Sequence, residues 1–179
     1  QVYWSDTHQL STYIDDYHAW LDREADAEHA ATEIIGELYV PRSALPDFLG
    51  EVADDFRSND VDCIYGTIRL IERDDESFLT WAKQPYACTI FNLHTPHTIG
   101  GVEHSSAAFR RLIDMAVRRE GSWFLTYHRC ATRSQLLACY PELPEFLRLK
   151  RRYDPNETFQ SEWYRHHATL LASLLADDD

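Results

Sequence analysis

Residues 62–71 read DCIYGTIRLI, and this stretch decides the fold because it has the alternating pattern of a β-strand. Successive side chains of a strand point to opposite faces, so one face carries Cys63, Tyr65, Thr67 and Arg69. Residues 86–94, YACTIFNLH, are rich in β-branched and aromatic side chains and lie between Pro85 and Pro96. This composition predicts a second strand beside the first.

Upstream of this pair, the sequence predicts a strand and then a helix. EIIGELYV at 33–40 has the composition of a strand and ends at Pro41. Ser43 can cap a helix that runs to about Arg57. Its apolar residues recur at helical spacing, as expected for a helix with one buried face: Leu45, Phe48, Leu49, Val52 and Phe56.

Downstream, the same succession is repeated. The pattern from about Ser105 to Arg119 predicts a helix that Gly121 ends. WFLTYHR at Trp123–Arg129 then predicts a fourth strand. The order strand, helix, strand, strand, helix, strand is the split βαβ of a ferredoxin-like unit, an α+β fold with an antiparallel sheet and both helices on one face.

The terminal segments add further helices to this unit. In residues 1–32, Tyr13, Tyr17, Trp20 and Leu21 share one helical face. In residues 132–175, short helices are expected around Gln135–Cys139, Leu143–Lys150 and Glu162–Leu175. The length of 179 residues fits one domain, and we expect a single domain over 1–179.

Charge and composition exclude several classes of partner. The net charge is −13, and residues 1–60 hold 14 of the 30 acidic and 3 of the 17 basic side chains. Such a surface repels a phosphate backbone, so no nucleic-acid partner is expected. No apolar run is long enough for a membrane span, so none is predicted. The spacing of the four cysteines favours free thiols, which indicates a reducing, cytoplasmic location.

Sequence motifs for common chemistries are lacking. There is no glycine-rich phosphate loop, no G-x-S-x-G and no H-E-x-x-H, so the chain by itself has no recognisable nucleotide-binding module. His94 and His97 have H-x-x-H spacing, and His104 follows. A metal site needs three or four such ligands to converge, so a metal- or haem-binding protein stays an alternative, while the main prediction assigns no metal.

The best candidate site lies on the predicted sheet. An arginine inside a strand needs an anion or hydrogen bonds unless its face is open to water, which singles out Arg69. His128 falls within the fourth predicted strand. The two helices cover one face of the sheet, so we expect Arg69 and His128 to project together from the other face. Tyr65 or Phe91 would line the same groove, and Asn92 and His94 would add to it.

A family resemblance is carried by residues 121–167, from GSWFLTYHR to EWYRHH. This stretch resembles the C-terminal end of FAD-linked oxidases of the vanillyl-alcohol oxidase/p-cresol methylhydroxylase type. In that family a helix is followed by a Lys-x-x-x-Asp-Pro turn and an aromatic segment, and the matching residues are Lys150, Tyr153, Asp154, Pro155 and Phe159. ELYVPRSALPDFL and YGTIRLIERDDESFLTWA are similar to the substrate-domain segments of the same family, so the resemblance covers residues 3–167 in pieces.

The resemblance implies that residues 1–179 are the C-terminal cap, or substrate, domain of an FAD-dependent oxidoreductase that oxidises an alcohol-type substrate such as a sugar or lactone. FAD would be held mainly by an N-terminal domain that is missing from this chain, and the substrate would lie between the flavin ring and the sheet. The isolated chain would then be inactive. The alternative is a stand-alone ferredoxin-like binding module without catalysis.

The resemblance also implies residue roles. The aldonolactone/alditol oxidase branch has an acid-x-Arg pair, which Thr67 and Arg69 match except that threonine replaces the acid. His128 matches the histidine of a His-Trp-x-Lys segment, whereas Arg129 and Ala131 replace its tryptophan and lysine. The resulting prediction makes Arg69 and His128 catalytic, with His128 assisting proton removal. The predicted substrate-binding residues are Tyr65, Thr67, Phe91, Tyr127 and Arg129.

Overall fold

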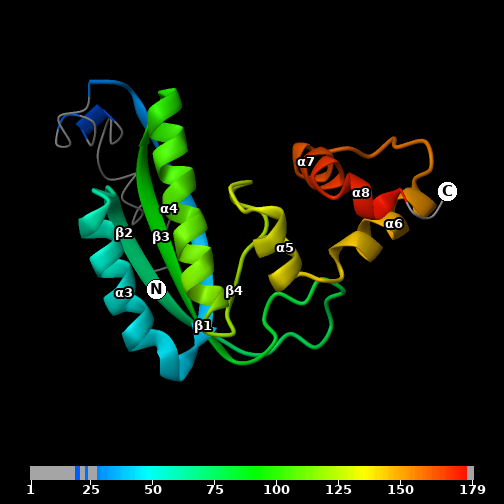
Figure 1. The fold of residues 1–179 in the computed structure, drawn as a ribbon, viewed down its shortest axis with the longest axis horizontal. Helices are drawn as coiled ribbons and strands as arrows, with labels where there is room; N and C mark the ends of the chain where they lie inside the picture. Colours follow the sequence, from blue (N-terminus) through cyan, green and yellow to red (C-terminus); the bar gives the residue numbers. More distant parts are fainter. Residues whose placement is uncertain (1–18, 21–22, 24–27, 177–179) are drawn as a thin grey trace, which may run out of the picture.

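The computed structural model describes residues 19–20, 23 and 28–176. Its centre is a four-stranded sheet in the order β2-β3-β1-β4, in which every neighbouring pair is antiparallel (Figure 1). The strands are β1 (Ala31–Pro41), β2 (Cys63–Ile71), β3 (Tyr86–Pro96) and β4 (Ser122–Trp123). With helices after β1 and β3, this order is the predicted split βαβ, and the α+β prediction is confirmed.

Two helices lie side by side on one face of this sheet (Figure 1). A 3₁₀ turn, η3 (Arg42–Ala44), leads into α3 (Leu45–Ser58), and α4 (Ile99–Val117) follows β3. The prediction of Ser43 as the cap is wrong, because the helix begins at Leu45 and Ala44 holds the N-cap position without a side-chain hydrogen bond. Helix α4 also begins six residues before the predicted start, since the Thr98 hydroxyl accepts a hydrogen bond from the Gly101 N–H.

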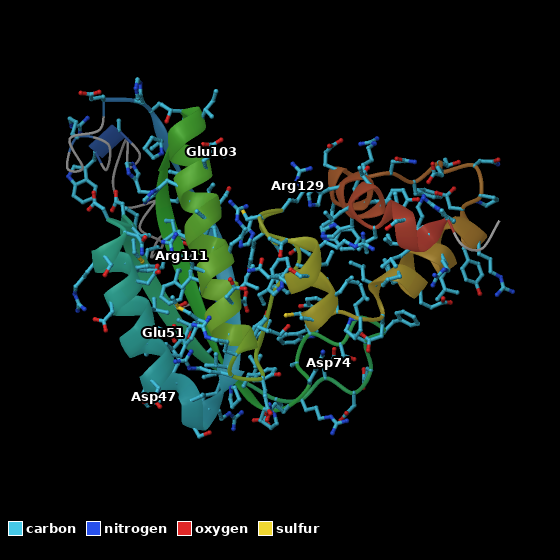
Figure 2. The ribbon with its side chains drawn as sticks, in the orientation of Figure 1. Asp47, Glu51, Asp74, Glu103, Arg111 and Arg129 are labelled. Carbon is cyan, nitrogen blue, oxygen red and sulfur yellow. The ribbon has the colours of Figure 1, made fainter. Side chains whose placement is uncertain are left out.

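Charged side chains join α3 to α4. Asp55 on α3 receives two hydrogen bonds from Arg111 on α4, at 2.7 and 3.0 Å. Glu51 on α3 pairs with both Arg118 and Arg119 near the end of α4. Figure 2 shows Glu51 and Arg111 pointing into the space between the two helices. These pairs fix how the helices cover the sheet.

A close approach of backbone and helix explains the glycine in β1. A β-carbon at Gly36 would come within 2.1 Å of the Phe109 ring on α4. The glycine therefore lets α4 lie against the middle of the sheet, above a core that contains Leu38, Phe91 and Leu112.

The fourth strand is much shorter than predicted. Only Ser122 and Trp123 pair with β1, and the chain turns away at residues 125–127. The physical reason lies in the C-terminal helices, which take over the hydrogen bonding. The Tyr140 hydroxyl donates to the Trp123 carbonyl, and Trp163 Nε1 donates to the Leu125 carbonyl at 3.1 Å. The prediction of a strand reaching Arg129 is therefore wrong.

The C-terminal helices form a group beside the sheet (Figure 1). They are α5 (Arg133–Cys139), α6 (Leu143–Tyr153), α7 (Glu162–Leu170) and α8 (Ala172–Leu175), which confirms the helices predicted there. Most of the helix expected in residues 1–32 lies outside the described residues. None of the helices in the described part of the chain is long and apolar enough to cross a membrane.

The Lys-x-x-x-Asp-Pro motif forms the turn after α6. Lys150 Nζ contacts Asp154 Oδ2 at 2.8 Å, and the Asp154 carboxylate also accepts the backbone N–H groups of Thr158 and Phe159 at 2.9 Å each. Lys150 Nζ lies 4.2 Å from the centre of the Tyr164 ring on α7. The motif therefore ties α6 to α7 and has a structural role in this chain.

Candidate functional site

The strand register separates two faces of the sheet. Gly36 and its partner Phe91 face the helices, so residues one position away face the opposite side, called here the open face. One row across β2, β3 and β1 places Arg69 beside Cys88 and Cys88 beside Tyr39. The next row places Thr67 beside Ile90 and Ile90 beside Glu37. Polar side chains from three strands therefore meet on the open face.

Glu37 is the centre of this polar group. Its Oε1 accepts hydrogen bonds from Cys88 Sγ at 2.9 Å and from the Tyr39 hydroxyl at 3.1 Å. Tyr127, from the turn after β4, lies close enough to Glu37 for the carboxylate to raise the pKa of its phenol. Burial and the neighbouring carboxylate both raise the pKa of the Cys88 thiol and of the Tyr39 phenol. Cys88 and Tyr39 therefore stay protonated and act as donors to the carboxylate.

Arg69 and Tyr127 form the exposed side of the group. Partial desolvation and then Glu37 raise the pKa of Tyr127, whereas the Arg69 charge opposes that rise and also opposes the rise at Cys88. Arg69 is therefore close enough to act on both side chains. Among the described residues, no carboxylate forms an ion pair with Arg69, although the nearby Arg42 and Arg73 each have one.

One further polar side chain lies on the open face. Asn92 of β3 is buried, and its Nδ2 donates to Glu33 Oε2 at 3.2 Å. Its Oδ1 has no hydrogen-bond partner within the described part of the chain. At one end of the same face, Trp81 and Ala82 from the connection between β2 and β3 pack on Tyr39 and Tyr86. The polar group thus lies next to an apolar wall.

The predicted placement of His128 beside Arg69 is wrong. His128 stacks on Phe109 of α4, with 4.2 Å between ring centres, and on Trp123, with 5.7 Å, both of which belong to the core under the helices. It lies on the helix side because the chain has already left the sheet, so strand alternation no longer applies. Burial lowers the pKa of His128 to about 4, which makes it a neutral packing residue at neutral pH.

Two predicted substrate-binding residues also lie elsewhere. Phe91 is buried on the helix side, where its ring meets Phe56 of α3 edge to face. Arg129 donates to the Glu162 carbonyl at 3.3 Å and lies between the loop and the start of α7 (Figure 2). The structure therefore brings together Tyr65, Thr67, Arg69 and Tyr127, and separates Phe91, His128 and Arg129 from them.

The three histidines considered for metal binding have separate partners. His94 Nδ1 pairs with Asp62 at 2.9 Å, His97 contacts the Thr32 hydroxyl, and His104 contacts the Asp60 carbonyl at 3.3 Å. His94 and His104 line a cavity of about 480 Å³ at the start of α4, and His97 does not. Within the described ranges, no three histidine, cysteine or acidic side chains are arranged to hold a metal ion.

Sequence reasoning missed Glu37 and Cys88. Glu37 lies in a stretch identified only as β-branched and aromatic, and Cys88 lies in one identified only as a strand. The signal was the strand alternation itself, which puts Glu33 and Glu37 on one face of β1 and two non-polar neighbours, Gly36 and Leu38, on the other. A partly buried carboxylate in the middle of a sheet needs hydrogen-bond donors from the neighbouring strands. For Glu37 these donors are Cys88 and Tyr39, which belong to the candidate site.

Comparison with known proteins gives no assignment. No protein-family model matches this sequence, and no curated protein matches it significantly.

Proposed function

We propose that this chain is the substrate-binding cap domain of an FAD-dependent oxidoreductase that oxidises an alcohol-type substrate, and that the open face of its sheet lines the substrate site. The observation that carries the proposal is the polar group around Glu37, with Cys88 and Tyr39 as donors and with Tyr127 and Arg69 beside them. A hydrogen-bonded carboxylate and a guanidinium that has no ion-pair partner among the described residues form, on one sheet face, an arrangement able to bind and deprotonate a hydroxyl group.

The residues of the open face fit the ring-and-substrate side of a flavin site. Arg69 and Tyr127 supply donors, and the buried Asn92 Oδ1 is an acceptor without a described partner. The sequence has no glycine-rich loop for the diphosphate, so the FAD-binding domain of the same protein would hold FAD. When bound there, FAD supplies the acceptor for the hydride of the substrate C–H bond.

In this proposal, the chain's own residues bind the substrate and take up a proton. Arg69 and Thr67 position substrate oxygens from β2, with Tyr65 at the side. Cys88 and Tyr39 donate to Glu37 and hold the carboxylate in place, and Glu37 accepts the hydroxyl proton as the C–H bond breaks. Glu37 replaces His128 in this role, because His128 lies among the core aromatics on the other side of the sheet.

The test is to isolate the native protein that contains this chain and to examine it for flavin. We expect a flavin spectrum that bleaches without oxygen when sugars, lactones, alditols or hydroxy acids are added. We expect Glu37→Gln to keep the flavin spectrum and to slow the bleaching at least ten-fold, whereas His29→Gln, an exposed site away from the open face, should not slow it. A native protein without flavin, or one whose flavin no alcohol reduces, would refute the proposal.

A further inference from the structure

Arg69 differs from Arg42 and Arg73 in that no described carboxylate neutralises it. Arg42 contacts Glu72 at 2.6 Å, and Arg73 contacts Asp75 at 2.6 Å. Two positions before Arg69, on the same face, lies Thr67, which carries no charge. The guanidinium is therefore a single positive charge without a fixed anion, at the exposed edge of the candidate site.

The side chains around Arg69 carry no charge. Cys88 is its register partner in β3, and Tyr127 is close enough for its pKa to respond to the Arg69 charge. Thr67 adds a hydroxyl on the same strand face. A guanidinium beside the Thr67 and Tyr127 hydroxyls is complementary to the oxygens of an anion, and the planar guanidinium matches a carboxylate with two parallel hydrogen bonds.

Glu37 lies on the far side of Cys88 from Arg69. Cys88 contacts Glu37 Oε1 at 2.9 Å, and β1 and β2 are separated only by β3, which puts them roughly 10 Å apart. A small ligand can therefore place an anionic group on Arg69 and a hydroxyl near Glu37 and Tyr127. A ligand without the anion would leave the guanidinium unpaired once a second domain closed over the face, at a cost in free energy.

One guanidinium suits one negative charge. The chain carries a net charge of −13, so a dianion such as a phosphate monoester would be repelled by the protein as a whole, and Arg69 would neutralise one of its two charges. We propose that the open face takes a hydroxy-carboxylate, with its carboxylate on Arg69 and its hydroxyl beside Glu37. This inference rests on the proposed function and narrows the alcohol to an acid such as a sugar acid.

The experiment compares gluconate with sorbitol, a neutral alditol of the same chain length, as ligands of this chain. Binding is followed by amide chemical-shift changes in β1, β2 and β3 at constant ionic strength. We expect gluconate to shift amides around Arg69 and Cys88 saturably and to bind at least ten-fold more tightly than sorbitol. Arg69→Gln should weaken gluconate binding at least ten-fold, whereas Arg133→Gln, an exposed arginine on α5, should leave it unchanged.

Each other outcome overturns the inference. Equal binding of gluconate and sorbitol, or equal loss in both variants, would show that the Arg69 charge does not select the ligand. Absence of saturable gluconate binding would overturn it as well. The proposed function is judged separately by the flavin spectrum of the native protein and its bleaching by alcohols. An alcohol-reducible flavin together with equal binding would refute only the carboxylate assignment.

Discussion

His128 should make the protein less stable in acid, because its ring is stacked in the core between Phe109 and Trp123. Its pKa is about 4 in the folded protein and about 6.5 in the unfolded chain. Between these values the unfolded chain binds more protons, so the free energy of unfolding falls as the pH falls. Linkage gives a loss of about 2 kcal/mol from pH 7 to about pH 5, and about 3 kcal/mol once both states are protonated.

The assay is urea unfolding at several pH values between about 7 and 4, with His128→Phe as the variant. Phenylalanine keeps a ring between the two aromatics but cannot be protonated. At pH 7 it should cost about 1 kcal/mol, because the Cys130 N–H loses its contact with His128 Nδ1 at 3.4 Å. Burial lowers the pKa of His166 and His167 as well, but both remain in the variant.

The comparison therefore isolates one side chain. Wild type should lose about 2 kcal/mol more than His128→Phe between pH 7 and about pH 5. His29→Gln, at an exposed histidine, should follow the wild-type curve. Parallel curves for wild type and His128→Phe would refute the reasoning, since His128 would then titrate alike in the folded and unfolded states.

Three further predictions follow from named contacts. Gly121→Ala should destabilise the protein by about 3 kcal/mol or more in urea unfolding, because the new β-carbon would meet the Tyr39 carbonyl at 2.1 Å, whereas Gly50→Ala on α3 meets nothing and should stabilise by about 0.5–1 kcal/mol. A loss of stability for Gly121→Ala no larger than that for Gly50→Ala would contradict this ranking. Glu37→Gln should lower the pKa of the exposed Tyr127 phenol, measured by the pH dependence of its NMR ring signals, because the carboxylate charge is removed; an unchanged titration would show that Glu37 does not act on Tyr127. The isolated chain should be colourless after desalting in the presence of FAD, because its sequence has no phosphate-binding loop; a retained yellow colour would contradict this.

The fold was predictable because its periodicities are local and strong. The alternation in β2, the strand composition of β1 and β3 and the helical spacing in α3 and α4 together give the order of the split βαβ. The length of β4 was not predictable, since it is decided by Tyr140 and Trp163, whose side chains take the carbonyls of Trp123 and Leu125 from across the molecule. A strand pattern shows that a segment can pair in a sheet. Hydrogen bonds from residues far along the chain decide how many of its residues do so.

The candidate site was predictable only in part, for the same reason. Arg69, Thr67 and Tyr65 lie on the predicted face because β2 is a regular strand throughout that region. The prediction for His128 required the strand alternation to continue past Trp123. The turn at residues 125–127 ends that alternation. Predicting the contact between Glu37 and Cys88 requires the register of β1 against β3. That register brings together two residues that are 51 positions apart in the chain.

The register of the sheet also bears on the order in which the protein folds. β2 and β3 are joined by the short connection at residues 72–85, whereas β1 must find β3 across the whole of α3 and β2. Closing the short loop costs less entropy, so we expect the β2–β3 hairpin to form early and β1 to dock late. Until β1 docks, the Cys88 thiol lacks its Glu37 neighbour and faces solvent. Alkylation of Cys88 at set times during refolding would therefore measure when β1 docks on β3.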